Sequence, residues 1–94
     1  SMSAKRILVV CGTGVATSTV VVQKVRAFCE SEGIDATISQ GAVADLVNGS
    51  PNADLIVATT QVPANVRIPV VHGLPFLTGM GVDAVHAQLR EHLA

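Results

Sequence analysis

The sequence predicts an α/β fold, a three-layer αβα sandwich in which helices cover both faces of a four-stranded parallel sheet. Strand-like apolar runs alternate with helical patterns along the 94 residues, and this alternation is typical of βαβ units with right-handed crossovers. The first run, residues 6–10, is continuously apolar after its arginine, as expected of a strand buried on both faces. Apolar residues make up 49% of the chain and charged residues 14%, which is the composition of one compact domain.

Each element has its own signal in the sequence. The expected strands lie at residues 6–10, 35–40, 54–59 and 68–71, and the expected helices at residues 16–32, 43–47 and 82–93. The long helix has apolar residues at helical spacing and stops at Gly33, which suits the left-handed position after a helix. Pro69 cannot donate to a sheet ladder, which places the last strand at an edge. Residues 72–81 contain three glycines and Pro75, and we expect a loop with a single turn there.

Charge and composition exclude several classes of protein. The net charge is −1 and the chain has no Trp or Tyr, so it offers neither a basic field nor a stacking platform for nucleic acid. No apolar run approaches the roughly 20 residues of a membrane helix, so no membrane insertion is expected. Two cysteines are too few for a disulfide scaffold, and we expect reduced thiols and a cytoplasmic location. Residues 1–4 are interpreted as a cloning remnant or disordered start, and residues 5–94 as one domain.

The candidate site is the loop after the first strand, within VVCGTGVATST at residues 9–19. Two glycines permit close approach of the backbone, and hydroxyl residues follow them. N–H groups at a helix start have no partner inside the helix, and the helix dipole adds positive charge, so such a loop binds phosphate-like anions. The expected phosphate-binding residues are Gly12, Thr13, Gly14, Val15, Ala16, Thr17 and Ser18. The loops 59–66 and 72–81 are expected at the same carboxyl edge of the sheet, where ligands bind in such folds.

Cys11 is the candidate nucleophile of this loop. An ordinary thiol titrates near ~8.5, and a helix N-terminus lowers that pKa and raises the thiolate fraction. A cysteine at a strand end is also compatible with a small buried apolar residue, but the adjacent glycines and hydroxyls favour the functional interpretation. Cys29 lies on the apolar stripe of the long helix and is expected to be a core residue.

Other interpretations of the loop lack essential residues. A dinucleotide fingerprint would need glycine in place of Thr17 and an acidic residue in place of Gln40. A Walker A loop needs a lysine that is absent between Lys5 and Lys24. The sharper alternative is a low-molecular-weight cysteine phosphatase, but Thr17 stands where its arginine would be, and no Asp-Pro supplies its acid. The loop is therefore equipped to accept a phosphoryl group rather than to hydrolyse it. A non-catalytic anion-binding module stays open as a further alternative.

The remaining candidates are one accessory residue and three peripheral ones. His72 follows the last strand at the same edge of the sheet. Two roles are equally compatible with this position: contact with a phosphate or a partner, and structural capping of the loop. Arg67 fits a solvated loop charge better than a partner contact. His86 and His92 are expected at the surface or its boundary. The sequence has no cluster of histidines and carboxylates at ligand spacing, so neither a metal nor another cofactor is expected.

The segment KRILVVCGTGVATST, residues 5–19, resembles the B component of enzyme II (EIIB) of the bacterial sugar phosphotransferase system (PTS). The resemblance extends from Lys5 to about Leu93. The ending VATST and the segment VVHGLPFLTGMG, residues 70–81, are similar to the galactitol-specific type.

This resemblance implies a cytoplasmic phosphocarrier with a fold like that of the low-molecular-weight phosphatases and the strand order 2-1-3-4. It implies that Cys11 accepts a phosphoryl group from a histidine of the A component and passes it to a sugar or polyol bound by the membrane C component. Residues 12–18 would form the phosphate loop. Choice of the sugar or polyol belongs mainly to the C component.

Overall fold

The computed structural model describes residues 4–11, 15–47 and 52–93. Within these residues the chain forms the following elements in order: β1 (Lys5–Cys11), α1 (Val15–Glu32), β2 (Ala36–Ala42), α2 (Ala44–Val47), β3 (Leu55–Ala58), β4 (Val70–His72), α3 (Pro75–Thr78) and α4 (Val82–Leu93). Every strand and helix expected from the sequence is present. The bounds of α4 are those predicted, and α3 is the single turn expected within residues 72–81.

The four strands form one sheet in the order β2-β1-β3-β4, and all neighbouring pairs are parallel. This confirms the predicted fold class, strand direction and strand order. The four residues of β3 are completely buried, because other elements cover this central strand on both faces. β4 lies at an edge as predicted, and the carbonyl of Pro69 before it accepts a 3.0 Å hydrogen bond from the Ile56 N–H.

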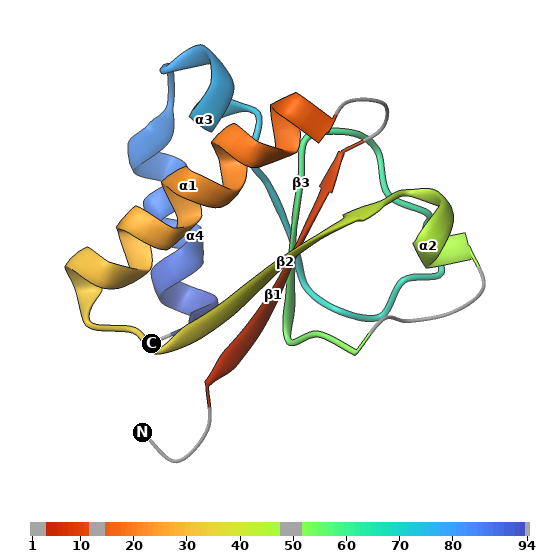
Figure 1. The fold of residues 1–94 in the computed structure, drawn as a ribbon, viewed down its shortest axis with the longest axis horizontal. Coiled ribbons are helices and arrows are strands. Elements are labelled where there is room, and N and C mark those ends of the chain that lie inside the picture. Colours follow the sequence, from red (N-terminus) through yellow and green to blue (C-terminus); the bar gives the residue numbers. More distant parts are fainter. Residues whose placement is uncertain (1–3, 12–14, 48–51, 94) are drawn as a thin grey trace.

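Helices α1, α3 and α4 cover one face of the sheet (Figure 1). The inward residues of α1 recur at helical spacing, as predicted, and those of α4 do the same. The main buried side chains of the two helices are Val21, Val25, Phe28 and Cys29 in α1, and Val85, Leu89 and Leu93 in α4. They pack against alternate residues of β1 and β3, so this layer fixes the position of α1 on the sheet.

The opposite face is covered mainly by chain that is not helical. Its core consists of Val10, Leu46, Ile56 and Ala58. Around it pack α2 and the segment at residues 59–69, which contributes partly buried Val62, Val66 and Ile68. The predicted third layer is therefore present, but a helix of four residues and an irregular segment with a turn at residues 63–66 form it (Figure 1). Pro63 and Pro69 disfavour a helix in this segment, while its apolar residues still pack on the sheet.

The end of α1 has the geometry expected of Gly33. This glycine has φ +68°, and its N–H donates to the Glu30 carbonyl at 3.3 Å. The Ile34 N–H donates to the Cys29 carbonyl at 2.9 Å. These two bonds form a Schellman motif, which satisfies carbonyls that have no partner within the helix. The motif turns the chain directly into β2.

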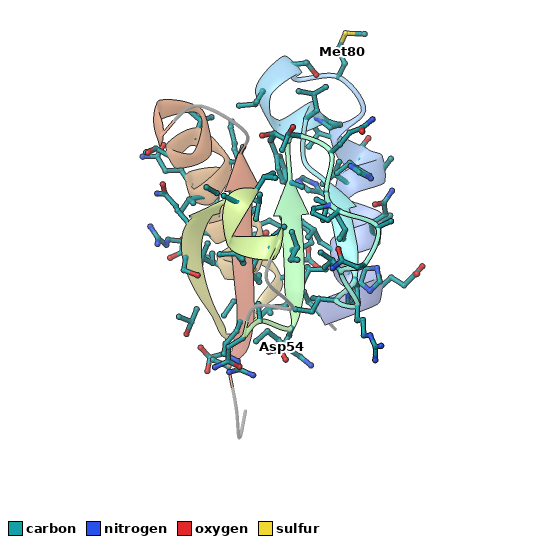
Figure 2. The ribbon with its side chains drawn as sticks, turned by 90° about the vertical axis from the view of Figure 1, so that its right-hand side faces the viewer. Asp54 and Met80 are labelled. Atoms are coloured by element: carbon teal, nitrogen blue, oxygen red, sulfur yellow. The ribbon has the colours of Figure 1, made fainter. Side chains whose placement is uncertain are left out.

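The amino end of the sheet is closed by contacts between Arg6 and Asp54. The Arg6 backbone N–H donates to the Asp54 carboxylate at 2.8 Å, and the Asp54 N–H donates to the Arg6 carbonyl at 2.7 Å. The hydrogen bond from the Arg6 backbone lowers the pKa of the Asp54 carboxyl. Figure 2 shows Asp54 at the end of the molecule opposite Met80. The polar contacts of this end are therefore remote from the carboxyl edge.

Candidate functional site

Cys11 is the last residue of β1 and lies at the carboxyl edge of the sheet. Its Cα is paired with that of Ala42 in β2. The sequence placed the strand at residues 6–10, so β1 extends one residue further than predicted at each end. α1 begins at Val15, close to the tip of β1 (Figure 1). The predicted loop residues Gly12, Thr13 and Gly14 lie outside the described residues.

The other predicted loop residues form the first turn of α1. The helix starts at Val15 rather than at residue 16, so residues 15–18 are its first four residues. The backbone N–H groups of this turn have no acceptors within the helix and lie at the positive end of its dipole. The connection between strand and helix is thus three residues long, and it brings the start of α1 to the end of the strand that contains Cys11. This is the arrangement that the anion-site hypothesis requires.

Thr59 is a neighbour of this site that the predicted site residues did not include. It follows β3 directly, and its N–H donates a 3.1 Å hydrogen bond to the carbonyl of Val10, the residue before Cys11. Thr59 is half-buried. The sequence carried a signal for it, because the residue that follows a central parallel strand must reach the same edge as its neighbour.

His72 lies farther from Cys11 than its shared edge suggested. It is the last residue of β4 and is paired with Ala58, so β3 separates it from β1. Two strand spacings correspond to about 10 Å between backbones. Val71 belongs to the core on the α1 face and Val70 packs on the other face. Strand alternation therefore directs His72 to the face opposite α1, and its side chain is exposed.

Three of the chain segments at the carboxyl edge contain no charged side chains, whereas the segment after β2 contains Asp45 in α2. No Asp, Glu, Lys or Arg occurs in residues 7–23, 55–66 or 68–82. The first cation along α1 is Lys24, nine residues after the helix start, or about 13 Å along the axis. Within these segments, stabilisation of a bound anion thus falls to backbone N–H groups, hydroxyls and the helix dipole.

Cys29 is a core residue, as predicted. Its side chain is 3% exposed and packs in the cluster between α1 and the sheet. Burial raises the pKa of its thiol, because the thiolate would lose its hydration. The two cysteines therefore differ in their location: Cys11 ends β1 at the carboxyl edge of the sheet, and Cys29 lies within the core.

A separate hollow lies between α1, α3 and α4. Its volume is about 330 Å³, and both phenylalanines of the chain line it together with Lys24 and His86. The His86 ring stacks on Phe28 with centroids 4.7 Å apart and is half-buried, at the boundary where the sequence placed it.

Arg67 and His92 are exposed, as expected. Among the described residues, no group of three or more His, Cys, Asp or Glu side chains is placed to hold a metal ion.

The fold and this edge together define a class of protein. It is an α/β protein with a parallel sheet of order 2-1-3-4, in which a strand ends in cysteine and a helix start follows after three residues. Helix starts are in general suited to binding anions, and the region beyond the strand ends is where this architecture binds ligands.

Comparison with known proteins gives the family. Residues 6–88 match the family of the PTS lactose/cellobiose-specific IIB subunit. The chain belongs to this IIB family and is a phosphotransferase component of the PTS.

Curated relatives match most of the chain. The putative phosphotransferase enzyme IIB component SgcB of Escherichia coli K12 is 36% identical over 86 residues, which are 92% of this chain and 94% of the relative. The galactitol-specific EIIB component of Escherichia coli O157:H7 is 33% identical over 86 residues, which are 90% of this chain and 92% of the relative. These matches confirm the resemblance to the galactitol-specific type.

A solved structure supports the fold. The cellobiose-specific phosphotransferase IIB component of Borrelia burgdorferi aligns over 100% of this chain and 99% of its own, with a TM-score of 0.53 and 21% identity. Separately, none of the helices within the described ranges has the length and apolar character needed to cross a membrane.

Proposed function

We propose that this protein is a cytoplasmic phosphocarrier of a sugar or polyol PTS and that Cys11 carries the phosphoryl group. The observation that carries the proposal is the end of β1 in cysteine directly before the start of α1, in a chain of the IIB family. The first-turn N–H groups and the helix dipole stabilise both a thiolate and a phosphoryl dianion. The same short connection thus activates the nucleophile and holds its product.

The transfer consists of two displacements at phosphorus. In the first, the Cys11 thiolate attacks the phosphoryl group on a histidine of the A component; an S–P bond forms and the N–P bond breaks. The histidine leaves as neutral imidazole after it takes up a proton. In the second, a hydroxyl oxygen of the substrate held by the membrane C component attacks phosphorus. An O–P bond forms, the S–P bond breaks, Cys11 returns to thiolate and the hydroxyl proton is released.

The phosphoenzyme must resist water between these two steps. Thr17 stands where a cysteine phosphatase has its arginine clamp, and residues 7–23, 55–66 and 68–82 contain no carboxylic acid to protonate a leaving group. Stabilisation by backbone N–H groups alone holds the phosphoryl group and does not supply the acid and clamp of hydrolysis. Residues 12–18 are proposed as its binding loop, with His72 as an accessory residue.

A galactitol-type polyol is the proposed substrate class. Its support is that relatives of this chain over about 90% of its length bear the galactitol-specific name. The ascorbate-specific EIIB components match a shorter part, 67% of the chain. Membrane vesicles that contain the C component should therefore phosphorylate galactitol faster than ascorbate when this protein supplies the phosphoryl group.

Phosphorylation by the A component tests the role of Cys11. Incubation with a histidine-phosphorylated A component should add one phosphoryl group, seen as a mass shift located on Cys11 by peptide mapping. Cys11→Ser should remain unlabelled, and Cys29→Ser is the matched control that should label like the wild type. Labelling that persists in Cys11→Ser would overturn the proposal. Sustained release of phosphate from p-nitrophenyl phosphate would favour the phosphatase alternative instead.

A further inference from the structure

The exposed apolar residues of the protein gather in one segment between β4 and α4. Leu74 is 52% exposed, Leu77 36% and Met80 77%. Val20 in α1, at 40%, is a further exposed large apolar side chain. We call Leu74, Leu77 and Met80 the apolar rim. In Figure 2 the Met80 side chain projects outward at the tip of the molecule, so it is available to another surface.

The apolar rim lies at the same end of the molecule as Cys11. The Thr59 N–H donates to the Val10 carbonyl at 3.1 Å, and the Gly73 N–H donates to the Ala58 carbonyl at 2.7 Å. These bonds join the ends of β1, β3 and β4 in sequence, and Leu74 follows immediately. α3, which contains Leu77, also contacts α1, and Figure 1 shows α3 at the end of the sheet where β1 ends.

The absence of charge in the surrounding segments shows what kind of surface fits there. Residues 7–23, 55–66 and 68–82, which include Cys11 and the apolar rim, contain no Asp, Glu, Lys or Arg. Acidic residues also occur at Asp45, after β2, and at Asp83, in the first turn of α4. A charged partner surface placed here would lose its hydration without gaining an opposite charge from these segments. An uncharged, apolar surface would lose little and would bury the exposed side chains. Complementarity at this end is therefore apolar rather than electrostatic.

We propose that the apolar rim is the docking surface for the phosphohistidine donor protein and that this contact is insensitive to salt. The inference rests on the proposed function, because only a phosphoryl transfer to Cys11 requires this occupant. A histidine fixed in a protein reaches Cys11 only if the surrounding donor surface covers the carboxyl edge. Two strand spacings, about 10 Å, separate β1 from β4, well within an interface of about 800 Å² on each partner.

The side chains of the rim suit this contact. Met80 is flexible and adapts to the shape of an opposing surface. The hollow of about 330 Å³ begins beside it, since Phe76 and Gly79, which line the hollow, neighbour Leu77 and Met80 in the chain. An apolar anchor of the donor can enter such a hollow, as anchors commonly do at interfaces.

Charge substitutions of both signs test the proposal. The measurement is the rate constant of Cys11 phosphorylation at a donor concentration below saturation. Met80→Glu, Met80→Lys and Leu74→Glu should each lower it by about tenfold or more. Thr37→Glu places the same charge on exposed β2 beside Arg6, far from the rim, and should leave the rate unchanged. The alkylation rate of Cys11 by iodoacetamide should be the same in all variants, which shows that the thiol itself is unaffected.

Each outcome decides between the alternatives. The wild-type rate constant should change by less than about threefold between 50 and 500 mM salt, whereas electrostatic steering changes on-rates by about 10-fold to 1000-fold. If Met80→Glu and Met80→Lys changed the rate constant in opposite directions, or if the rate constant fell steeply with salt, the donor would be attracted by charge, and apolar docking would be wrong. Unchanged rates in all rim variants would assign the rim to the membrane acceptor or to a second copy of the chain. An unlabelled wild-type protein would instead contradict the proposed function.

Discussion

Gly73 and Val57 approach each other so closely that no side chain fits between them. A Cβ atom built on Gly73 would lie 2.7 Å from the Val57 Cγ1 atom. Gly73 is buried where β4 leads into α3, and its N–H donates to the Ala58 carbonyl. The absence of a side chain therefore lets the chain turn from the sheet edge into the segment that carries the apolar rim.

Gly73→Ala should lower the free energy of unfolding by about 1–3 kcal/mol, the usual effect of overpacking a well-packed core. Val57 belongs to a central strand and can move little to accommodate the methyl group. Urea unfolding followed by circular dichroism measures the change. In the double variant Val57→Ala/Gly73→Ala the clash is removed, so the two effects should be less than additive. Strict additivity would show that the close approach does not constrain this position.

Gly33→Ala should destabilise the protein for a different reason. Nothing lies within 4 Å of the Cβ position at Gly33, but its φ is +68°. A residue with a Cβ atom pays about 1–2 kcal/mol in this left-handed conformation. Gly33→Asn should lose less, because asparagine tolerates this conformation. Equal urea midpoints for the alanine and asparagine variants would contradict this backbone explanation.

Glu32 and Arg90 form an ion pair that joins the end of α1 to α4. The Arg90 Nε and Nη2 atoms donate to the two Glu32 carboxylate oxygens at 3.0 and 3.3 Å. This hydrogen bonding holds the pKa of Glu32 below its ordinary value of 4.5. The folded state therefore binds a proton less readily than the unfolded state, and the stabilisation is complete above about pH 4.5 and lost as pH falls through the folded pKa.

Glu32→Gln tests this linkage. The variant should be less stable than the wild type near neutral pH, by a small amount because the pair is on the surface. The difference between their urea midpoints should shrink below pH 4.5, as the wild-type carboxyl becomes protonated. Asp54→Asn is a useful comparison, since the pKa of Asp54 is also lowered, in this case by the hydrogen bond from the Arg6 backbone. Parallel stability curves for wild type and Glu32→Gln between pH 3 and 7 would contradict the contribution of the ion pair.

The sequence predicted the fold well where one physical signal dominates. Continuous apolar runs identified the central strands because both of their faces are buried. The glycine at residue 33 identified the end of α1 because few residues adopt a positive φ. The second face was less predictable. Much of its layer is an irregular segment held by Val62, Val66 and Ile68. Scattered apolar residues between prolines have no periodicity that would reveal such packing.

The candidate site was predictable in its position but not in its detail. The end of an apolar run before a helix places Cys11 at the carboxyl edge, and the structure agrees. The end of β1 and the start of α1 each differ from the prediction by one residue, and pairing with β2 extends β1 as far as Cys11. The distance of His72 from Cys11 depends on which strands are neighbours, and the exposure of Met80 depends on tertiary packing. A local sequence pattern does not encode these relationships.

The two cysteines should react at very different rates in the folded protein. Cys29 is almost completely buried, and burial raises the pKa of its thiol, so both access and thiolate fraction are low. Cys11 ends β1 at the edge where α1 begins, where a helix start favours the thiolate. Iodoacetamide near neutral pH should therefore add one carbamidomethyl group to the native protein, on Cys11.

In 8 M urea, both cysteines should be modified at similar rates, because unfolding removes both the burial of Cys29 and the helix start beside Cys11. Cys11→Ser should give almost no adduct in the native state, whereas Cys29→Ser should react like the wild type. Rapid modification of Cys29 in the native protein, measured by peptide mapping, would contradict its placement in the core.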